Sequence, residues 1–277
     1  MTTAGGARRA AGASLAVSVQ ALHVYPVKSL RGVAVPAATV TDRGLEHDRR
    51  FMVVDEAGRF LTQRTLPRMS LVSAHLEPPA LRLSAPARAD LLLPLRPAGG
   101  DILGVEVWRD RCDALSLGPE AARWLGEFLG LRCRLVYMPD ATFRGTSQVY
   151  APGRVGFADA YPFLVTSTSS LAELARRGGG VPMERFRPNI VVDGAPPFAE
   201  DRWKEFRIGP VSFRMTKPCV RCAITTVDPA LGAVAGAEPL RTLATFRRCE
   251  EGVLFGMNAV HEGTGAIRVG DAVEVVR

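Results

Sequence analysis

Apolar and polar residues alternate along many short stretches of this chain, a pattern typical of β-strands. Val17–Val24 is the first such stretch and is rich in valine. Further strands are predicted over Pro36–Thr41, Arg50–Asp55, Arg59–Thr62, Ser70–Leu76, Leu81–Leu83, Asp101–Trp108, Arg111–Leu115 and Arg132–Tyr137. Two hairpins are expected, one turning at residues 56–58 and one at residues 109–110. The Pro-rich stretch 86–100 reads as a loop around one short strand.

One helix interrupts this pattern in the first half. Pro119 suits the first position of a helix. Leu125, Phe128 and Leu129 then form an apolar stripe at helical spacing, and Gly130 ends it. The following segment, Pro139–Gly156, is polar and contains glycine, so it is expected to be a flexible loop or linker.

The second half repeats the mixture of short strands and few helices. Strands are predicted over Tyr161–Thr166, Ile190–Asp193, Val211–Met215, Ala223–Val227, Val253–Val260 and Ala272–Val276. One helix is expected to be capped by Thr168 or Ser169 and to end at Gly178–Gly180. A second, short helix is expected over Pro239–Arg247.

These elements predict an α+β, β-rich fold with few short helices and a barrel-like β core in the second half. No βαβ alternation, no G-x-G-x-x-G after a strand and no Walker sequence occurs, which argues against a nucleotide-binding doubly wound sheet. We predict a disordered tail over residues 1–16, a first domain over 17–138 and a second over 139–277.

Composition places the protein in a soluble, reducing setting. Five cysteines at irregular spacing argue against a disulfide framework. No apolar run is long enough for a membrane span, and no apolar segment of a secretory signal follows Arg8 and Arg9. We therefore expect a cytoplasmic protein without a membrane anchor.

The formal net charge of +7 favours anionic partners. The arginines are spread along the chain, and the aromatic residues do not interleave with them as in a nucleic-acid-binding surface. The charge therefore points away from nucleic acid and toward an anionic small molecule or an acidic protein.

The most informative segment is K-P-C-V-R-C-A-I-T-T-V-D-P at Lys217–Pro229. Cys222 is predicted at a loop-to-strand junction, where the backbone is rigid. The adjacent Arg221 is expected to lower the pKa of the thiol and favour the thiolate, which binds metals or acts as a nucleophile. A buried, purely structural cysteine is the alternative. Four scattered histidines and no second cysteine pair argue against a closed zinc site.

Motifs spread along the whole chain then suggest a family. They are Y-P-V-K-S-L-R-G at 25–32, G-L-E-H-D-R-R-F-M-V at 44–53, F-A-D-A-Y-P-F-L-V at 157–165, F-R-P-N-I-V at 186–191, P-C-V-R-C-A-I-T-T-V-D-P at 218–229, L-F-G-M-N-A-V at 254–260 and I-R-V-G-D-A-V at 267–273. With these the chain resembles the molybdenum cofactor sulfurase C-terminal (MOSC) domain proteins. More narrowly, it is similar to the amidoxime-reducing components of mitochondria and their bacterial relatives. The resemblance implies an N-terminal MOSC-type domain followed by a β-barrel-like MOSC domain.

The resemblance also implies a molybdenum cofactor, in which a pterin dithiolene and one protein thiolate hold the metal. The thiolate position matches Cys222, and soft thiolate suits such a metal. Cys219 is expected to be merely packed, and a supporting contact beside the metal site is the alternative. The implied cofactor-binding residues are Lys28, Ser29, Arg49, Asp159, Tyr161, Arg187, Asn189, Arg221 and Asn258. Tyr161 and Asn258 depart from the residues that eukaryotic relatives carry there.

Two strand-based expectations refine this set. If residues 49–50 lie in a strand, Arg50 points away from the face of Arg49. If residues 187–189 alternate in the same way, Arg187 and Asn189 share one face.

The implied activity is molybdenum-dependent reduction of N-hydroxylated compounds such as amidoximes, hydroxamic acids and N-hydroxylated bases. Because the chain carries no iron–sulfur cysteine cluster, electrons are expected from a separate ferredoxin-, flavin- or cytochrome-type donor protein. One alternative is a sulfur-transfer or cofactor-carrier protein with a persulfide on Cys222. The other is a non-enzymatic anion-binding module.

Overall fold

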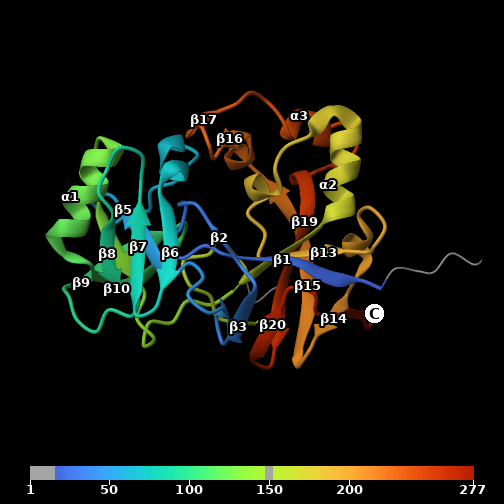
Figure 1. Ribbon diagram of the computed structural model, residues 1–277, viewed down its shortest axis with the longest axis horizontal. Coiled ribbons are helices and arrows are strands. Elements are labelled where there is room, and N and C mark those ends of the chain that lie inside the picture. The colour runs from blue at the N-terminus through green and yellow to red at the C-terminus, as the bar shows by residue number, and fades with distance from the viewer. Residues whose placement is uncertain (1–15, 147–151) are drawn as a thin grey trace, which may run out of the picture.

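The largest sheet joins strands from both ends of the chain (Figure 1). The computed structural model describes residues 16–146 and 152–277. In spatial order the sheet contains β2 (Val33–Val35), β1 (Ser18–Val24), β13 (Ile190–Asp193), β12 (Phe163–Ser167), β19 (Gly252–Glu262), β15 (Val211–Arg221), β14 (Glu205–Ile208) and β21 (Val273–Val275), with β18 (Arg248–Cys249) paired to β19. Ser18 bridges to Ala272, and the amide of Val19 donates to the carbonyl of Asp271 at 2.9 Å. These contacts join the first strand to the last, so the sheet closes into the expected barrel.

The interior of this barrel is filled by alternating apolar residues of its strands. Leu22, Val165 and Ile190 are fully buried there, and Phe206 stacks on Phe213 at 4.8 Å between ring centroids. Two short helices lie against the barrel, α2 (Thr168–Leu174) and α3 (Leu240–Leu243), as Figure 1 shows. The α+β, β-rich fold class with few short helices is therefore confirmed.

The other part of the molecule, called the N-terminal lobe, is built from the middle of the first half of the chain and lies on the left of Figure 1. It contains the sheet β5 (Phe51–Val54), β11 (Arg134–Tyr137), β10 (Asp110–Ser116) and β9 (Ile102–Val107), and the sheet β6 (Ser73–Glu77), β7 (Ala80–Ser84) and β8 (Leu91–Pro94). The helix α1 (Gly118–Leu129) packs Leu125 and Phe128 into the core of this lobe. Gly130 ends the helix in the left-handed conformation (φ 76°), as predicted.

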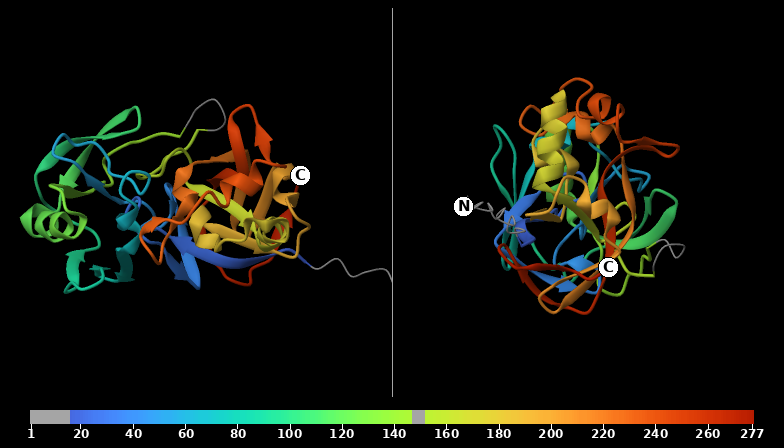
Figure 2. Two further views of the ribbon diagram at one scale, coloured as in Figure 1. Left: turned by 90° about the horizontal axis from the view of Figure 1, so that it is seen from above. Right: turned by 90° about the vertical axis from the view of Figure 1, so that its right-hand side faces the viewer.

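Strand pairing crosses the sequence boundary that separates the two predicted domains. The strands β1 and β2 belong to the barrel, and β3 (Ala37–Thr41) pairs with β20 (Gly265–Arg268) and β4 (Gly44–Leu45). Viewed from above, the molecule is elongated, with the two lobes side by side (Figure 2). The division at residues 138 and 139 stays a prediction. The predicted tail falls almost wholly outside the described residues, as does part of the predicted loop 139–156.

Several predicted elements need correction. Val211–Met215 is only the beginning of β15, which continues to Arg221, and the predicted strand Ala223–Val227 contains a 3₁₀ turn over Ala223–Thr226. Ser167, not Thr168 or Ser169, caps α2, because its hydroxyl accepts from the amide of Ser170 at 3.2 Å.

The remaining corrections are local. The stretch 59–62 makes only isolated bridges, from Arg59 to Glu106 and from Phe60 to Val54. A 3₁₀ turn over Pro67–Leu71 replaces the start of the strand predicted from residue 70. Across residues 16–146 and 152–277, no helix has the length and apolarity to cross a bilayer.

Candidate functional site

A cleft of about 270 Å³ opens beside Cys222 where the two lobes meet. All ten residues that the sequence singled out line it: Lys28, Ser29, Arg49, Asp159, Tyr161, Arg187, Asn189, Arg221, Cys222 and Asn258. They come from six separate stretches of the chain, so only the tertiary fold brings them together. This space is called the cleft.

Cys222 lies at the end of β15, not at the beginning of a strand. Its backbone is extended (φ −117°, ψ 179°), and its carbonyl accepts from the amide of Thr225 at 3.2 Å and from the Thr225 hydroxyl at 3.0 Å. This turn fixes the backbone of Cys222 while its half-buried side chain faces the cleft. The predicted rigidity is therefore present, but a turn provides it.

The guanidinium beside the Cys222 sulfur belongs to Arg64, a residue that sequence reasoning missed. Nη1 of Arg64 lies 3.5 Å from Sγ of Cys222. Arg221 instead donates from Nη1 to Sγ of Cys219 at 2.9 Å and from Nη2 to the carbonyl of Phe186 at 2.7 Å. The hydrogen bonds of Arg221 are therefore directed at Cys219 and Phe186, not at its neighbour Cys222, and Cys219 lines the cleft.

Lys28 is buried at one wall of the cleft. Its ammonium donates to the carbonyl of Phe157 at 2.8 Å and forms an ion pair with Asp159, whose side chain is 60% exposed. Burial lowers the pKa of Lys28, and Asp159 offsets part of that effect. Partial loss of water around the Asp159 carboxyl acts to raise its pKa, but the charge and hydrogen bond of Lys28 outweigh this effect and hold the pKa well below its ordinary value.

Arg49 is held by a buried carboxylate. Its Nη1 lies 2.6 Å from Oδ2 of Asp48 and 3.0 Å from Oδ1 of Asn189. Burial raises the pKa of Asp48, and Arg49 and the amide of Tyr25 counteract that effect. Arg50 turns away and donates to the carbonyl of Met138, as expected. The reason is not strand alternation, since Arg49 has a left-handed backbone (φ 48°) and β5 begins only at Phe51.

Arg187 lines the cleft next to Arg49 and, like Arg49, has a left-handed backbone (φ 57°). Its guanidinium lies over the ring of Tyr25 at 4.3 Å, and Nη1 donates to the carbonyl of Leu30 at 2.7 Å. Burial lowers the pKa of Arg187 to about 10. Arg187 and Asn189 both line the cleft as predicted, although a turn, not strand alternation, directs Arg187 there.

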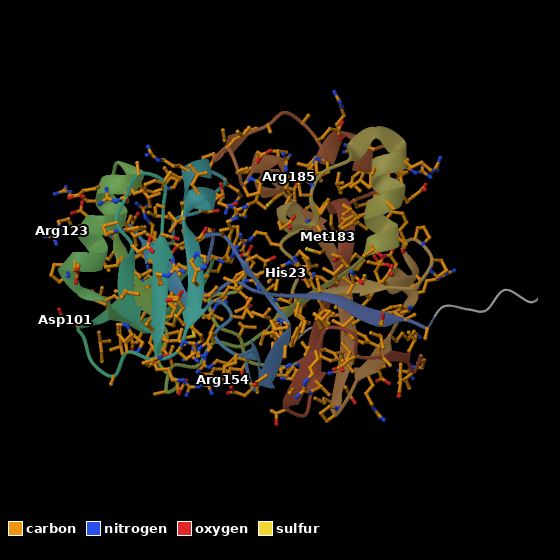
Figure 3. All side chains as sticks on the ribbon, viewed as in Figure 1. His23, Asp101, Arg123, Arg154, Met183 and Arg185 are labelled. Carbon is orange, nitrogen blue, oxygen red and sulfur yellow. The ribbon has the colours of Figure 1, made fainter. Side chains whose placement is uncertain are left out.

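Strands of the barrel also line the cleft. Asn258 lies in β19, and its amide donates to the carbonyl of Lys217 at 3.3 Å. Arg185, labelled in Figure 3, is buried and pairs with Asp228 at 2.7 Å. Met183, labelled nearby, accepts a hydrogen bond from the Thr166 hydroxyl at 3.4 Å. These contacts fix the segment that leads into Arg187.

The cleft is strongly cationic. Six basic residues line it, against one acidic residue, Asp159. They are Lys28, Arg49, Arg64, Arg187, Lys217 and Arg221. Cations at this density in a confined space attract an anionic ligand.

Comparison with known proteins defines the family. The family model of the MOSC N-terminal beta barrel domain matches residues 16–132, and that of the MOSC domain matches residues 152–274. Mitochondrial amidoxime-reducing component 1 of Mus musculus is 38% identical over 92% of this chain and 81% of its own length. This chain belongs to the MOSC-domain family.

Other relatives of this MOSC protein carry similar names. Mitochondrial amidoxime reducing component 2 of Rattus norvegicus and component 1 of Homo sapiens are each 36% identical, over 92% of this chain and 82% of their own lengths. Among solved structures, the YUAD protein from Bacillus subtilis superposes with a TM-score of 0.43 at 11% identity, over 93% of this chain and 94% of that one. That likeness is too distant to carry an argument.

The cleft fits a phosphate-bearing cofactor that brings most of the ligands of its own metal. Over residues 16–146 and 152–277, no group of three or more His, Cys, Asp or Glu side chains could hold a metal ion. A metal at Cys222 would therefore take few ligands from the protein and the others from an organic ligand. The surrounding cations suit the phosphate of such a ligand, so the residues present are compatible with the molybdenum–pterin cofactor.

Proposed function

We propose that this MOSC protein reduces N-hydroxylated compounds with a bound molybdenum–pterin cofactor, and that Cys222 is the protein ligand of the metal. The observation that carries the proposal is an accessible thiol in a cleft with six basic residues. The relatives named amidoxime-reducing components support the reaction type. Amidoximes, hydroxamic acids and N-hydroxylated bases are the proposed substrate class.

Different residues of the cleft would hold different parts of such a cofactor. Lys28, Arg49 and Arg187 would bind the phosphate, because each is a fixed cation whose position is set by hydrogen bonds. Asp159 and Asn189 would accept or donate hydrogen bonds at the polar edge of the pterin. Cys222, fixed by its turn, would hold the metal at the end of β15.

The bound cofactor would supply the two-electron chemistry of the reaction. In the overall balanced reaction, the N–OH group takes up two electrons and two protons and gives N–H and water. A separate donor protein of the ferredoxin, flavin or cytochrome type is proposed as the electron source. The protein's own contribution is to orient the substrate beside Cys222 and to hold the cofactor among the basic residues of the cleft.

The test is expression with the cofactor, followed by metal analysis and a benzamidoxime-reduction assay. Wild-type protein should contain near-stoichiometric molybdenum and turn over, and Cys222→Ala should lose turnover. Cys249→Ala is the matched control, because Cys249 is also half-buried but lies outside the cleft. Wild-type protein without molybdenum or pterin would overturn the proposal, and a persulfide on Cys222 without reductase activity would favour a sulfur carrier.

A further inference from the structure

Arg64 differs from the other arginines of the cleft in what it contacts. Arg49 is neutralised by Asp48, Arg187 donates to a carbonyl and Arg221 donates to Phe186 and Cys219. Within the described part of the chain, no carboxylate lies within 4.0 Å of the Arg64 guanidinium, and its side chain has Sγ of Cys222 as its hydrogen-bond acceptor. A guanidinium has five N–H donors, so Arg64 keeps donors available beside that sulfur.

Trp108 supports Arg64 from the rim of the cleft. The Arg64 guanidinium lies over the indole ring at 4.5 Å, and Phe60 packs against the same indole at 5.1 Å between ring centroids. The indole N–H donates to Oδ1 of Asp159 at 3.1 Å. Trp108 thus connects two residues of the cleft, one from each lobe.

The backbone conformation of Trp108 is strained, and burial of the side chain does not compensate for that strain. It lies in the β9–β10 turn with a left-handed backbone (φ 59°), which bulky residues rarely adopt. Its side chain is 45% exposed, whereas Trp124 and Trp203 are 8% exposed. Strain of this kind persists where surrounding contacts hold it and is frequent at functional sites.

We infer that Arg64 is a catalytic residue that donates hydrogen bonds to the oxygen of the substrate's N–OH group, and that Trp108 is the positioning residue that holds Arg64 there. This inference rests on the proposed function and adds the substrate-facing side of the same site. Arg64 and Trp108 come from the N-terminal lobe, and Trp108 shares the Asp159 carboxylate with Lys28, one of the cations assigned to the cofactor phosphate. The ligand class is therefore an N-oxygenated group whose oxygen accepts from the remaining N–H donors of Arg64, beside Cys222.

The proposed role of Arg64 follows from the negative charge that develops on the oxygen of the N–OH group during the reaction. When the N–O bond breaks, its electron pair goes to the oxygen, which leaves as water after taking up protons. The two electrons come from the donor protein proposed above, and nitrogen is reduced. A guanidinium aimed at that oxygen stabilises the growing negative charge without itself losing a proton, and removing one such donor typically costs on the order of 10²-fold in kcat.

The first experiment replaces Arg64 in the cofactor-loaded protein. Arg64→Gln should lower kcat on benzamidoxime on the order of 10²-fold, with KM changing far less and molybdenum content remaining at the wild-type level. The matched control is Arg68→Gln, because Arg68 is exposed and lies over Phe128, away from the cleft. A second readout needs no turnover. Benzamidoxime added to oxidised protein without an electron donor should quench the fluorescence of exposed Trp108, and Trp108→Phe should remove that signal.

The second experiment tests the positioning role by chemical rescue. Guanidinium ion, far below denaturing concentrations, should restore part of kcat to Arg64→Ala by occupying the space over the indole. The same ion should fail to rescue a variant that combines Arg64→Ala with Trp108→Leu. A merely structural role of either residue would not produce this dependence.

The outcomes separate the two proposals. If wild-type protein turns over and Arg64→Gln keeps its kcat, the inference is wrong and the proposed function stands. If Arg64→Gln loses molybdenum in proportion to its activity, Arg64 contacts the cofactor and the inference is likewise overturned. If wild-type protein holds no molybdenum and does not reduce benzamidoxime, both the proposed function and the inference about Arg64 are overturned.

Discussion

Single residues define the cleft through contacts that span the chain. The sequence located ten of its lining residues by resemblance to a family, yet the local reasons were partly wrong. Arg49 and Arg187 reach the cleft through left-handed backbones. No sequence motif pointed to Arg64 or Trp108, because their contacts with Cys222 and Asp159 form only when the two lobes pack together. Chemistry carried by a motif was thus predictable, whereas contacts between distant segments were not.

Gly156 gives a prediction at this scale. A Cβ atom there would lie 2.5 Å from the carbonyl oxygen of Arg49. Gly156→Ala should therefore shift the backbone of Arg49, lower stability by about 1–3 kcal/mol and reduce the molybdenum content of protein expressed with the cofactor. Urea unfolding and metal analysis provide the readouts. Gly99→Ala is the control, since nothing lies within 4 Å of the added atom. Equal behaviour of the two variants would refute the prediction.

Elements around Cys222 show why strand prediction fails locally. Pro218 interrupts the alternation of β15, and the β-branched run A-I-T-T-V favours a strand. In the structure the hydroxyls of Thr225 and Thr226 instead donate to the carbonyls of Cys222 and Ala223, at 3.0 and 2.7 Å. Such side-chain bonds to nearby backbone compete with strand formation. The helix α1 was predicted well because its C-terminal glycine and its apolar periodicity indicate the same element.

Glu200 supports the junction of β12 and α2 and gives a pH prediction. It is fully buried and accepts from the hydroxyls of Ser170 at 2.7 Å and Ser167 at 3.1 Å. Burial raises its pKa above 4.5, and the hydrogen bonds offset only part of the rise. The folded state then binds the proton more tightly than the unfolded state. Glu200 therefore stabilises the fold increasingly as pH falls through its folded pKa, and least at higher pH.

The measurement compares wild type with Glu200→Gln by urea unfolding at about pH 8 and about pH 5. Wild type should gain stability relative to the variant at the lower pH. Glu173→Gln is the control, since Arg176 and Arg177 lower the pKa of Glu173 to about 2 and it stays ionised at both values. A pH-independent difference between wild type and Glu200→Gln would contradict the assignment.

At the scale of the whole molecule, the cleft exists because strands from both ends of the chain close one barrel. The short-strand pattern predicted a β-rich fold and a barrel, and both are confirmed. It did not predict that β1 and β2 would join the barrel, because pairing over such sequence distance leaves no local pattern. This closure places Lys28, which follows β1, beside Asp159 from the second half.

The charge of the cleft predicts anion-dependent stability. Inorganic pyrophosphate should raise the melting temperature of cofactor-free protein, because a ligand that binds only the folded state adds stability, about 2.7 kcal/mol at 100 times Kd. Added NaCl should weaken the effect. Arg187→Met should reduce the pyrophosphate-dependent shift, and Arg68→Met should keep it. A shift that survives Arg187→Met unchanged would place the anion elsewhere.

The central claim is that the sulfur of Cys222 binds the metal. X-ray absorption at the molybdenum edge tests it most directly, because it counts the sulfur neighbours of the metal. Protein loaded with the cofactor should show one sulfur neighbour fewer in Cys222→Ala than in wild type, and Cys249→Ala should match wild type. An unchanged sulfur count in Cys222→Ala would contradict the account.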